Sequence, residues 1–113
     1  MSKFPIEFLK HIRDEIIYLT DTTDGLTEDK FMYDRTLQRS FSRSLEVIGE
    51  ATKQLTSEFK QEHPDVDWKA MAGMRDRLIH GYFEVDYAIV WDVVVNEIPQ
   101  LKNQIETILT SNS

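Results

Sequence analysis

The sequence contains no cysteine, which excludes disulfide bonds, Cys-based metal sites and Cys nucleophiles. It also lacks the HExxH zinc motif, a glycine-rich phosphate loop and the GxSxG turn of serine hydrolases. The histidines His11, His63 and His80 show no metal-ligand spacing with one another. Metal catalysis, serine hydrolase chemistry and ATP use therefore lack support, and we expect neither a metal nor a cofactor.

Long apolar runs are missing as well: none approaches the roughly 18 residues that a membrane span needs. The first ten residues, MSKFPIEFLK, have neither the apolar core nor the cleavage site of a signal peptide, so we expect a cytoplasmic protein. Positive charge is scarce, with 13 Lys and Arg against 20 Asp and Glu and a net charge of −7. This balance argues against nonspecific coating of nucleic acid, which needs broad neutralisation of phosphates. A nuclease with its basic side chains concentrated in one groove remains possible.

The apolar residues that are present recur at helical spacing. The pattern predicts long helices over residues 4–19, 28–60 and 87–108, with a polar loop at 20–27 and a short helix that carries Met71, Met74 and Leu78 towards Gly81. The length of 113 residues predicts one domain, residues 1–113. We predict an all-α fold, an antiparallel bundle of four to five helices.

Four residues should shape these helices. Gly49 predicts a kink or a close helix contact, because glycine inside a helix is unfavourable by roughly 1 kcal/mol. Pro99 cannot donate the expected backbone hydrogen bond, so we expect a kink or break near residues 95–99 with the same face buried on both sides. Thr27 and Asp86 are candidate N-caps.

The chemistry-bearing stretch is Arg75, His80 and Tyr82. Arginine grips phosphate with a fixed fork of donors, and histidine exchanges a proton near neutral pH. On an ideal helix, however, Arg75 and His80 would lie roughly 140° apart, so they share a cleft only if the helix loosens near Gly81. From spacing alone, an ion pair for Arg75, a helix-terminal His80 and a partly buried Tyr82 are the better-supported interpretations.

A second group of cations lies on the long helix. Arg35, Arg39 and Arg43 recur every four residues and should form one row on its surface. This row could follow the phosphates of an RNA backbone. Equally, its members could pair with acidic neighbours on the same helix, namely Asp34, Glu46 and Glu50. The sequence leaves both interpretations open.

The pattern Arg75-x4-His80-x-Tyr82 resembles the signature of the HepT-like toxins, within the HEPN superfamily of small helical ribonucleases. The similarity covers most of residues 37–105 in the family's order. It includes segments on the long helix, around the motif and in the last helix: Phe41–Ala51, Pro64–Trp68, Met71–Arg77, Gly81–Phe83, Val85–Asp86, Ile89–Trp91 and Ile98–Leu101. The order and number of these matches favour a functional interpretation of Arg75, His80 and Tyr82.

The resemblance implies a homodimer in which two motif segments meet in a cleft, so that each active site draws on two chains. It also implies metal-independent cleavage of RNA that leaves a 2′,3′-cyclic phosphate. His80 would act as general base or acid, and Arg75 would stabilise charge on the phosphoryl oxygens. Asp76 would orient Arg75 or the substrate, and Arg77 would help to hold the RNA backbone.

The resemblance further implies a partner, a minimal nucleotidyltransferase antitoxin (MntA-like) that transfers AMP to Tyr82. AMP there would add bulk and negative charge where an RNA phosphate must lie. The acidity of the chain favours a structured RNA target gripped locally, such as tRNA. Two alternatives remain, a non-catalytic docking or nucleotide-binding subunit of a nucleotidyltransferase complex and a purely structural helical dimer.

Overall fold

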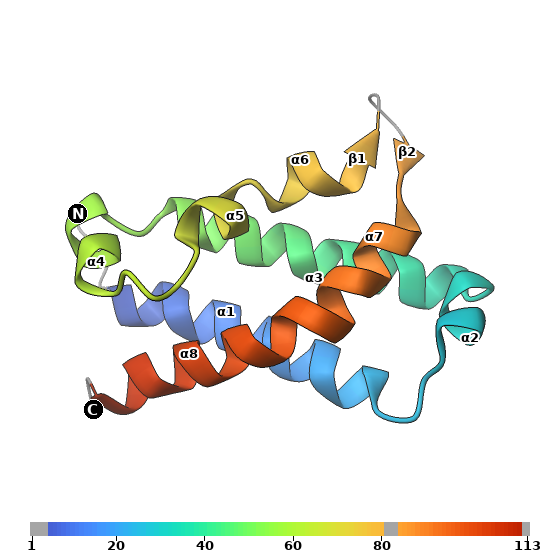
Figure 1. The fold of residues 1–113 in the computed structure, drawn as a ribbon, viewed down its shortest axis with the longest axis horizontal. Coiled ribbons are helices and arrows are strands. Elements are labelled where there is room, and N and C mark those ends of the chain that lie inside the picture. Colours follow the sequence, from blue (N-terminus) through green and yellow to red (C-terminus); the bar gives the residue numbers. More distant parts are fainter. Residues whose placement is uncertain (1–4, 81–83, 112–113) are drawn as a thin grey trace.

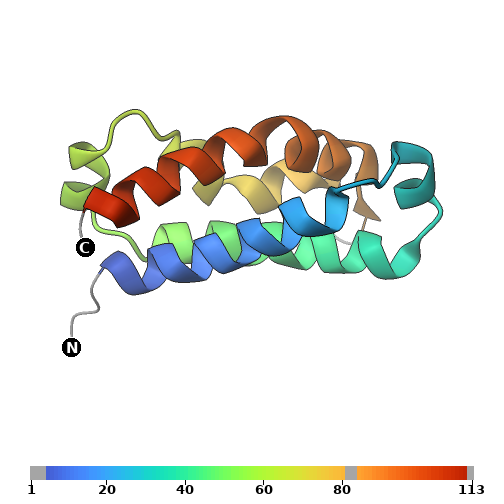
Figure 2. The ribbon, with the colours of Figure 1, turned by 90° about the horizontal axis from the view of Figure 1, so that it is seen from below.

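The computed structural model describes residues 5–80 and 84–111, and it confirms the all-α prediction. The long elements are α1 (Pro5–Thr23), α3 (Arg35–Lys53) and a continuous rod of α7 (Tyr87–Asp92), η1 (Val93–Glu97) and α8 (Ile98–Ser111). Figure 1 shows that α1 runs antiparallel to both α3 and this rod. Seen from below, the rod forms one layer of the bundle, and α1 and α3 form the other (Figure 2).

The core follows from the helical periodicity of α1. Leu9, Ile12, Ile16 and Leu19 are all fully buried. They recur at spacings of three and four, which places them on one face of the helix. Buried apolar residues of the other two long elements complete the cluster, among them Phe41, Leu45, Ile48, Ile98, Ile105 and Ile108. None of the helices in the described part of the chain has the length and hydropathy that crossing a bilayer requires.

The single helix predicted over residues 28–60 is wrong. The structure divides this stretch into α2 (Glu28–Met32), α3 and α4 (Ser57–Glu62). Asp34 caps α3 by accepting from the Leu37 N–H at 3.0 Å, and Thr56 caps α4 by accepting from the Phe59 N–H at 3.1 Å. A cap residue has an extended backbone, so each of these caps interrupts the helical run.

Other boundaries agree more closely with the sequence. Thr27 caps α2 and Asp86 caps α7, as predicted. The first helix continues four residues beyond the predicted end at Leu19, to Thr23, whose hydroxyl donates to the Leu19 carbonyl at 2.8 Å. The break expected before Pro99 is a π-helical turn, η1, which widens the helix just where proline cannot donate a backbone hydrogen bond.

Gly49 lies at a close contact between helices. It is buried where α5 (Trp68–Ala72) crosses α3, and a Cβ atom at this position would lie 3.1 Å from the Met71 carbonyl oxygen. The second of the two alternatives predicted for Gly49 is therefore confirmed. Only a residue without a side chain lets the backbones of α3 and α5 approach this closely.

We predict that Gly49→Val destabilises the protein by about 1–3 kcal/mol, the usual effect of overpacking. Helix propensity alone predicts the opposite sign, because valine is a better helix former than glycine. Urea unfolding followed by circular dichroism distinguishes the two effects. An unchanged or higher free energy of unfolding would contradict the close contact.

Candidate functional site

The segment with the sequence motif lies on top of α3. It consists of α5, α6 (Met74–Leu78) and β1 (Ile79–His80), and β1 pairs antiparallel with β2 (Glu84–Val85). Met71, Met74 and Leu78 are buried, so the predicted apolar face of this segment is correct. In Figure 1, α6 lies along α3, and the β1–β2 pair extends away from the helices beyond α6.

The helix of the motif ends earlier than predicted. It stops at Leu78 rather than close to Gly81, and Ile79 has extended backbone angles, φ −106° and ψ 124°. The Leu78 carbonyl accepts from the Asp86 N–H at 2.7 Å, a contact that ties the end of α6 to the start of α7. The separation of roughly 140° expected for an ideal helix therefore does not apply to Arg75 and His80.

The backbone of His80 belongs to β1 and pairs with Glu84 in β2. His80 is therefore the last residue of a strand that emerges from the end of α6, so the helix ends between Arg75 and His80. That the two side chains share a cleft stays a prediction. Tyr82, the predicted site of AMP attachment, lies outside the described residues, as does Gly81.

Arg75 projects from α6 towards α3. Its side chain is 62% exposed, and its Nε lies 3.9 Å from the Glu46 Oε2 of α3. The other carboxylate oxygen of Glu46 accepts from the Arg43 Nη1 at 3.3 Å. The ion pair expected for Arg75 is thus present, but at this distance and exposure it is weak. A phosphate could displace the carboxylate and bind both guanidinium groups.

Sequence reasoning missed Glu46 as the contact of Arg75. The sequence predicted instead that Asp76 orients Arg75 or the substrate. In the structure, Asp76 is an exposed residue of the same helix as Arg75. A spacing of three residues identifies Glu46 as a neighbour of Arg43 within α3. Its contact with Arg75 depends instead on the packing of α6 against α3, which has no local sequence signal.

Arg77 faces the opposite side of α6 from Arg75. Both its terminal nitrogens donate to the Glu97 carboxylate, Nη1 at 2.9 Å and Nη2 at 2.7 Å. Hydrogen bonding to Glu97 raises the pKa of Arg77 above its ordinary value. This paired contact joins α6 to η1 and gives Arg77 a structural role, while its predicted contact with RNA stays a prediction.

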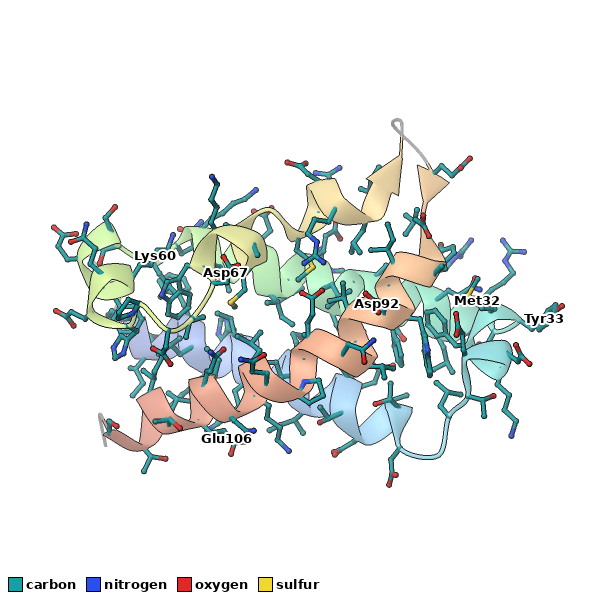
Figure 3. All side chains as sticks on the ribbon, in the orientation of Figure 1. Met32, Tyr33, Lys60, Asp67, Asp92 and Glu106 are labelled. Atoms are coloured by element: carbon teal, nitrogen blue, oxygen red, sulfur yellow. The ribbon has the colours of Figure 1, made fainter. Side chains whose placement is uncertain are left out.

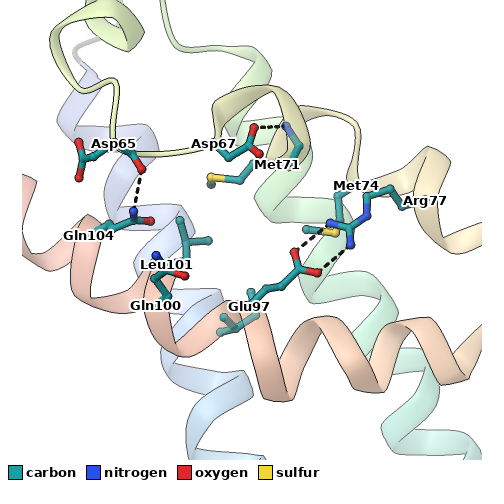
Figure 4. A pocket seen from close by; sticks show the side chains of 11 residues that line it. Asp65, Asp67, Met71, Met74, Arg77, Glu97, Gln100, Leu101 and Gln104 are labelled. Carbon is teal, nitrogen blue, oxygen red and sulfur yellow. Dashed lines mark hydrogen bonds and ion pairs between the residues drawn. The ribbon is translucent and has the colours of Figure 1, made fainter.

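A pocket of about 230 Å³ lies beside this ion pair (Figure 4). Its polar lining is largely engaged within the protein, since Asp67 caps α5 and the Gln104 side chain donates to the Asp65 carbonyl at 2.8 Å. Within the described residues, no group of three or more His, Asp or Glu side chains could hold a metal ion. Arg77 lines the pocket and Arg75 does not, so the pocket lies on the Arg77 side of α6.

The arginine row, Arg35, Arg39 and Arg43, is exposed along α3 as predicted. Pairing with an acidic neighbour, one of the two interpretations left open by the sequence, applies to only one of the three arginines. Arg43 pairs with Glu46, whereas Arg35 and Arg39 form no ion pair with any described residue. Their expected partners are occupied elsewhere, because Asp34 caps α3 and Glu50 pairs with Lys53 at 3.4 Å. Glu46 contacts both Arg43 and Arg75, so the arginine row and Arg75 lie on one surface.

Comparison with known proteins gives consistent matches. The sequence model of the family described as "Ribonuclease HepT-like" matches residues 12–108. A Caldanaerobacter subterraneus subsp. tengcongensis protein named "Putative RNase TTE0752" is 47% identical to the chain over 107 residues, which make up 95% of the chain and 96% of that protein. A Thermococcus cleftensis protein named "Probable ribonuclease HepT" is 38% identical over 94% of the chain and 96% of its own length.

A third similar protein, from Methanocaldococcus jannaschii, is named "Putative RNase MJ0127". It is 44% identical to the chain over 102 residues, which are 90% of the chain and 84% of that protein. No solved structure gives a significant match to the chain.

Proposed function

The chain belongs to the HepT-like ribonuclease family, and we propose that it cleaves RNA without a metal ion at a site built from Arg75 and His80. The observation that carries this proposal is the position of Arg75. It is exposed, only weakly held by Glu46, and meets the arginine row on the same surface. His80 follows at the end of a strand that leaves the same helix.

Cleavage in this scheme is an internal transfer of the phosphoryl group. The ribose 2′-oxygen bonds to the adjacent phosphorus, the bond from phosphorus to the 5′-oxygen breaks, and a 2′,3′-cyclic phosphate remains. A general base removes the proton of the 2′-hydroxyl, and a general acid protonates the departing 5′-oxygen. Arg75 exchanges the Glu46 carboxylate for the phosphate and stabilises the charge that grows on its oxygens.

The need for both a base and an acid supports a homodimer. His11 lies on α1, and His63 packs against Phe59 with ring centroids 4.7 Å apart, beyond the end of α4. Neither belongs to the segment that holds Arg75. In this scheme each chain therefore supplies one imidazole, that of His80, while the reaction needs both a base and an acid. In a symmetric dimer, the partner subunit's His80 takes the complementary role.

His80→Ala should reduce the rate of RNA cleavage by about 10²–10⁴-fold, the usual contribution of a general acid or base. Arg75→Ala should reduce it by about 10²-fold or more, because the charge on the phosphate loses its donor. Lys69→Ala removes an exposed positive charge from α5 and is the matched control, with an unchanged rate. The assay measures cleavage in EDTA and identifies the 2′,3′-cyclic ends.

Each variant should keep the circular dichroism spectrum and the oligomeric state of the wild type. Cleavage by purified His80→Ala at the wild-type rate would refute the assigned chemistry. Loss of all activity in EDTA, with recovery on adding a divalent metal, would refute the metal-independent mechanism.

We propose in addition that the protein is the toxin of a toxin–antitoxin pair and that a nucleotidyltransferase antitoxin transfers AMP to Tyr82. The physical support is position in the chain, because Tyr82 follows His80 by two residues. A phosphate attached there would add negative charge two residues after the proposed catalytic histidine, and this charge would oppose the binding of an RNA phosphate.

Incubation with the cognate nucleotidyltransferase and ATP should raise the intact mass by whole AMP units and abolish RNA cleavage. Tyr82→Phe should keep the unmodified mass and stay active after the same treatment. An unchanged wild-type mass would contradict the modification while leaving the nuclease proposal intact. A stable complex with no cleavage by unmodified protein would instead identify a docking subunit.

A further inference from the structure

Tyr33 is the most exposed large apolar side chain among the described residues. Its relative exposure is 90%, whereas the others that are exposed reach only 39%. Figure 3 labels Tyr33 at one end of the bundle, with its ring pointing away from the rest of the chain. Both faces of this ring are therefore accessible to a binding partner.

The turn that carries Tyr33 is firmly held. The buried Gln38 donates through Nε2 to the carbonyls of Phe31 and Met32, at 3.2 and 2.9 Å. The ring of Phe31 stacks on Phe41, with centroids 5.0 Å apart. The backbone N–H of Tyr33 donates to the Lys30 carbonyl at 3.3 Å. The backbone that carries the ring is therefore held in place by hydrogen bonds from Gln38 and within the turn.

The arginine row begins beside the ring and leads towards Arg75. Tyr33 borders a shallow hollow whose charged lining is mixed, with Lys30 and Arg35, the first member of the arginine row, and also Asp29 and Asp34. Asp34 is engaged as the N-cap of α3. From Arg35 to Glu46, the contact of Arg75, the axis of α3 advances roughly 17 Å at 1.5 Å per residue. One surface thus runs from an exposed aromatic ring, past Arg35 and Arg39, to the motif.

We infer that Tyr33 is a stacking platform for an unpaired base of the RNA substrate, a few nucleotides away from the scissile linkage. Arg35 and Arg39 bind the phosphates between that base and Arg75. The combination of a cationic track with an aromatic ring is how proteins bind single-stranded nucleic acid, because every base offers a π-face. The inference rests on the proposed function and adds a substrate class: RNA with a single-stranded segment beside the cut.

The test compares binding of a short, fluorescently labelled single-stranded oligoribonucleotide to wild type and to Tyr33 variants. Tyr33→Ala should raise Kd about tenfold by removing one base stack. Tyr33→Phe and Tyr33→Trp should bind nearly as well as the wild type, because both keep the ring. Val95→Ala, which removes an exposed apolar side chain from η1, is the control and should not change Kd.

Cleavage kinetics give an independent readout. A residue that binds RNA away from the reacting atoms should raise KM in Tyr33→Ala and leave kcat nearly unchanged. An unchanged Kd and KM would overturn the stacking role even if the wild type cleaves RNA. If the wild type does not cleave RNA but Tyr33→Ala still binds RNA more weakly, the stacking role of Tyr33 would be supported and the nuclease proposal would be refuted.

The oligomeric state and the complex with the nucleotidyltransferase are measured on the same variants. Loss of either assembly in Tyr33→Ala, with RNA affinity unchanged, would show that the ring is a protein contact and would overturn the inference.

Discussion

The close approach of α5 to α3 at Gly49 is the constraint on which the candidate site depends. Because Gly49 has no side chain, the Met71 carbonyl can pack closely against it. A Cβ atom at position 49 would lie only 3.1 Å from the Met71 carbonyl oxygen. This approach seats α5 on α3, and the buried Met74 and Leu78 hold the following helix, α6, against the core. Arg75 then reaches the Glu46 carboxylate, and two segments that lie far apart in the sequence share one surface.

The same packing explains how an acidic protein would hold RNA at the proposed site. The net charge of −7 opposes binding over the whole surface. Arg35 and Arg39 nevertheless form no ion pair with described residues, and Glu46 holds Arg43 and Arg75 only through exposed contacts. A phosphate that replaced Glu46 would gain two guanidinium groups. Such an arrangement favours local recognition over tight binding along the length of an RNA.

Features fixed by short-range chemistry could be predicted from the sequence. The buried faces of α1 and α8 follow from apolar spacing, the caps Thr27 and Asp86 from their side chains, and the disturbance before Pro99 from its missing N–H. Features fixed by contacts between helices could not. The contact of Arg75 with Glu46 and the hydrogen bond from the Asp86 N–H to the Leu78 carbonyl depend on how the helices pack and have no local sequence signal.

The central claim is that the arginine row and Arg75 hold the phosphates of one RNA, and the salt dependence of binding tests it most directly. For a single strand, the slope of log K against log salt changes by about 0.7 for each phosphate that the protein ceases to neutralise. The account predicts that Arg39→Ala and Arg75→Ala each make the slope for a single-stranded oligoribonucleotide shallower by about that amount. Lys69→Ala should leave it unchanged. A wild-type slope in either arginine variant would contradict the claim.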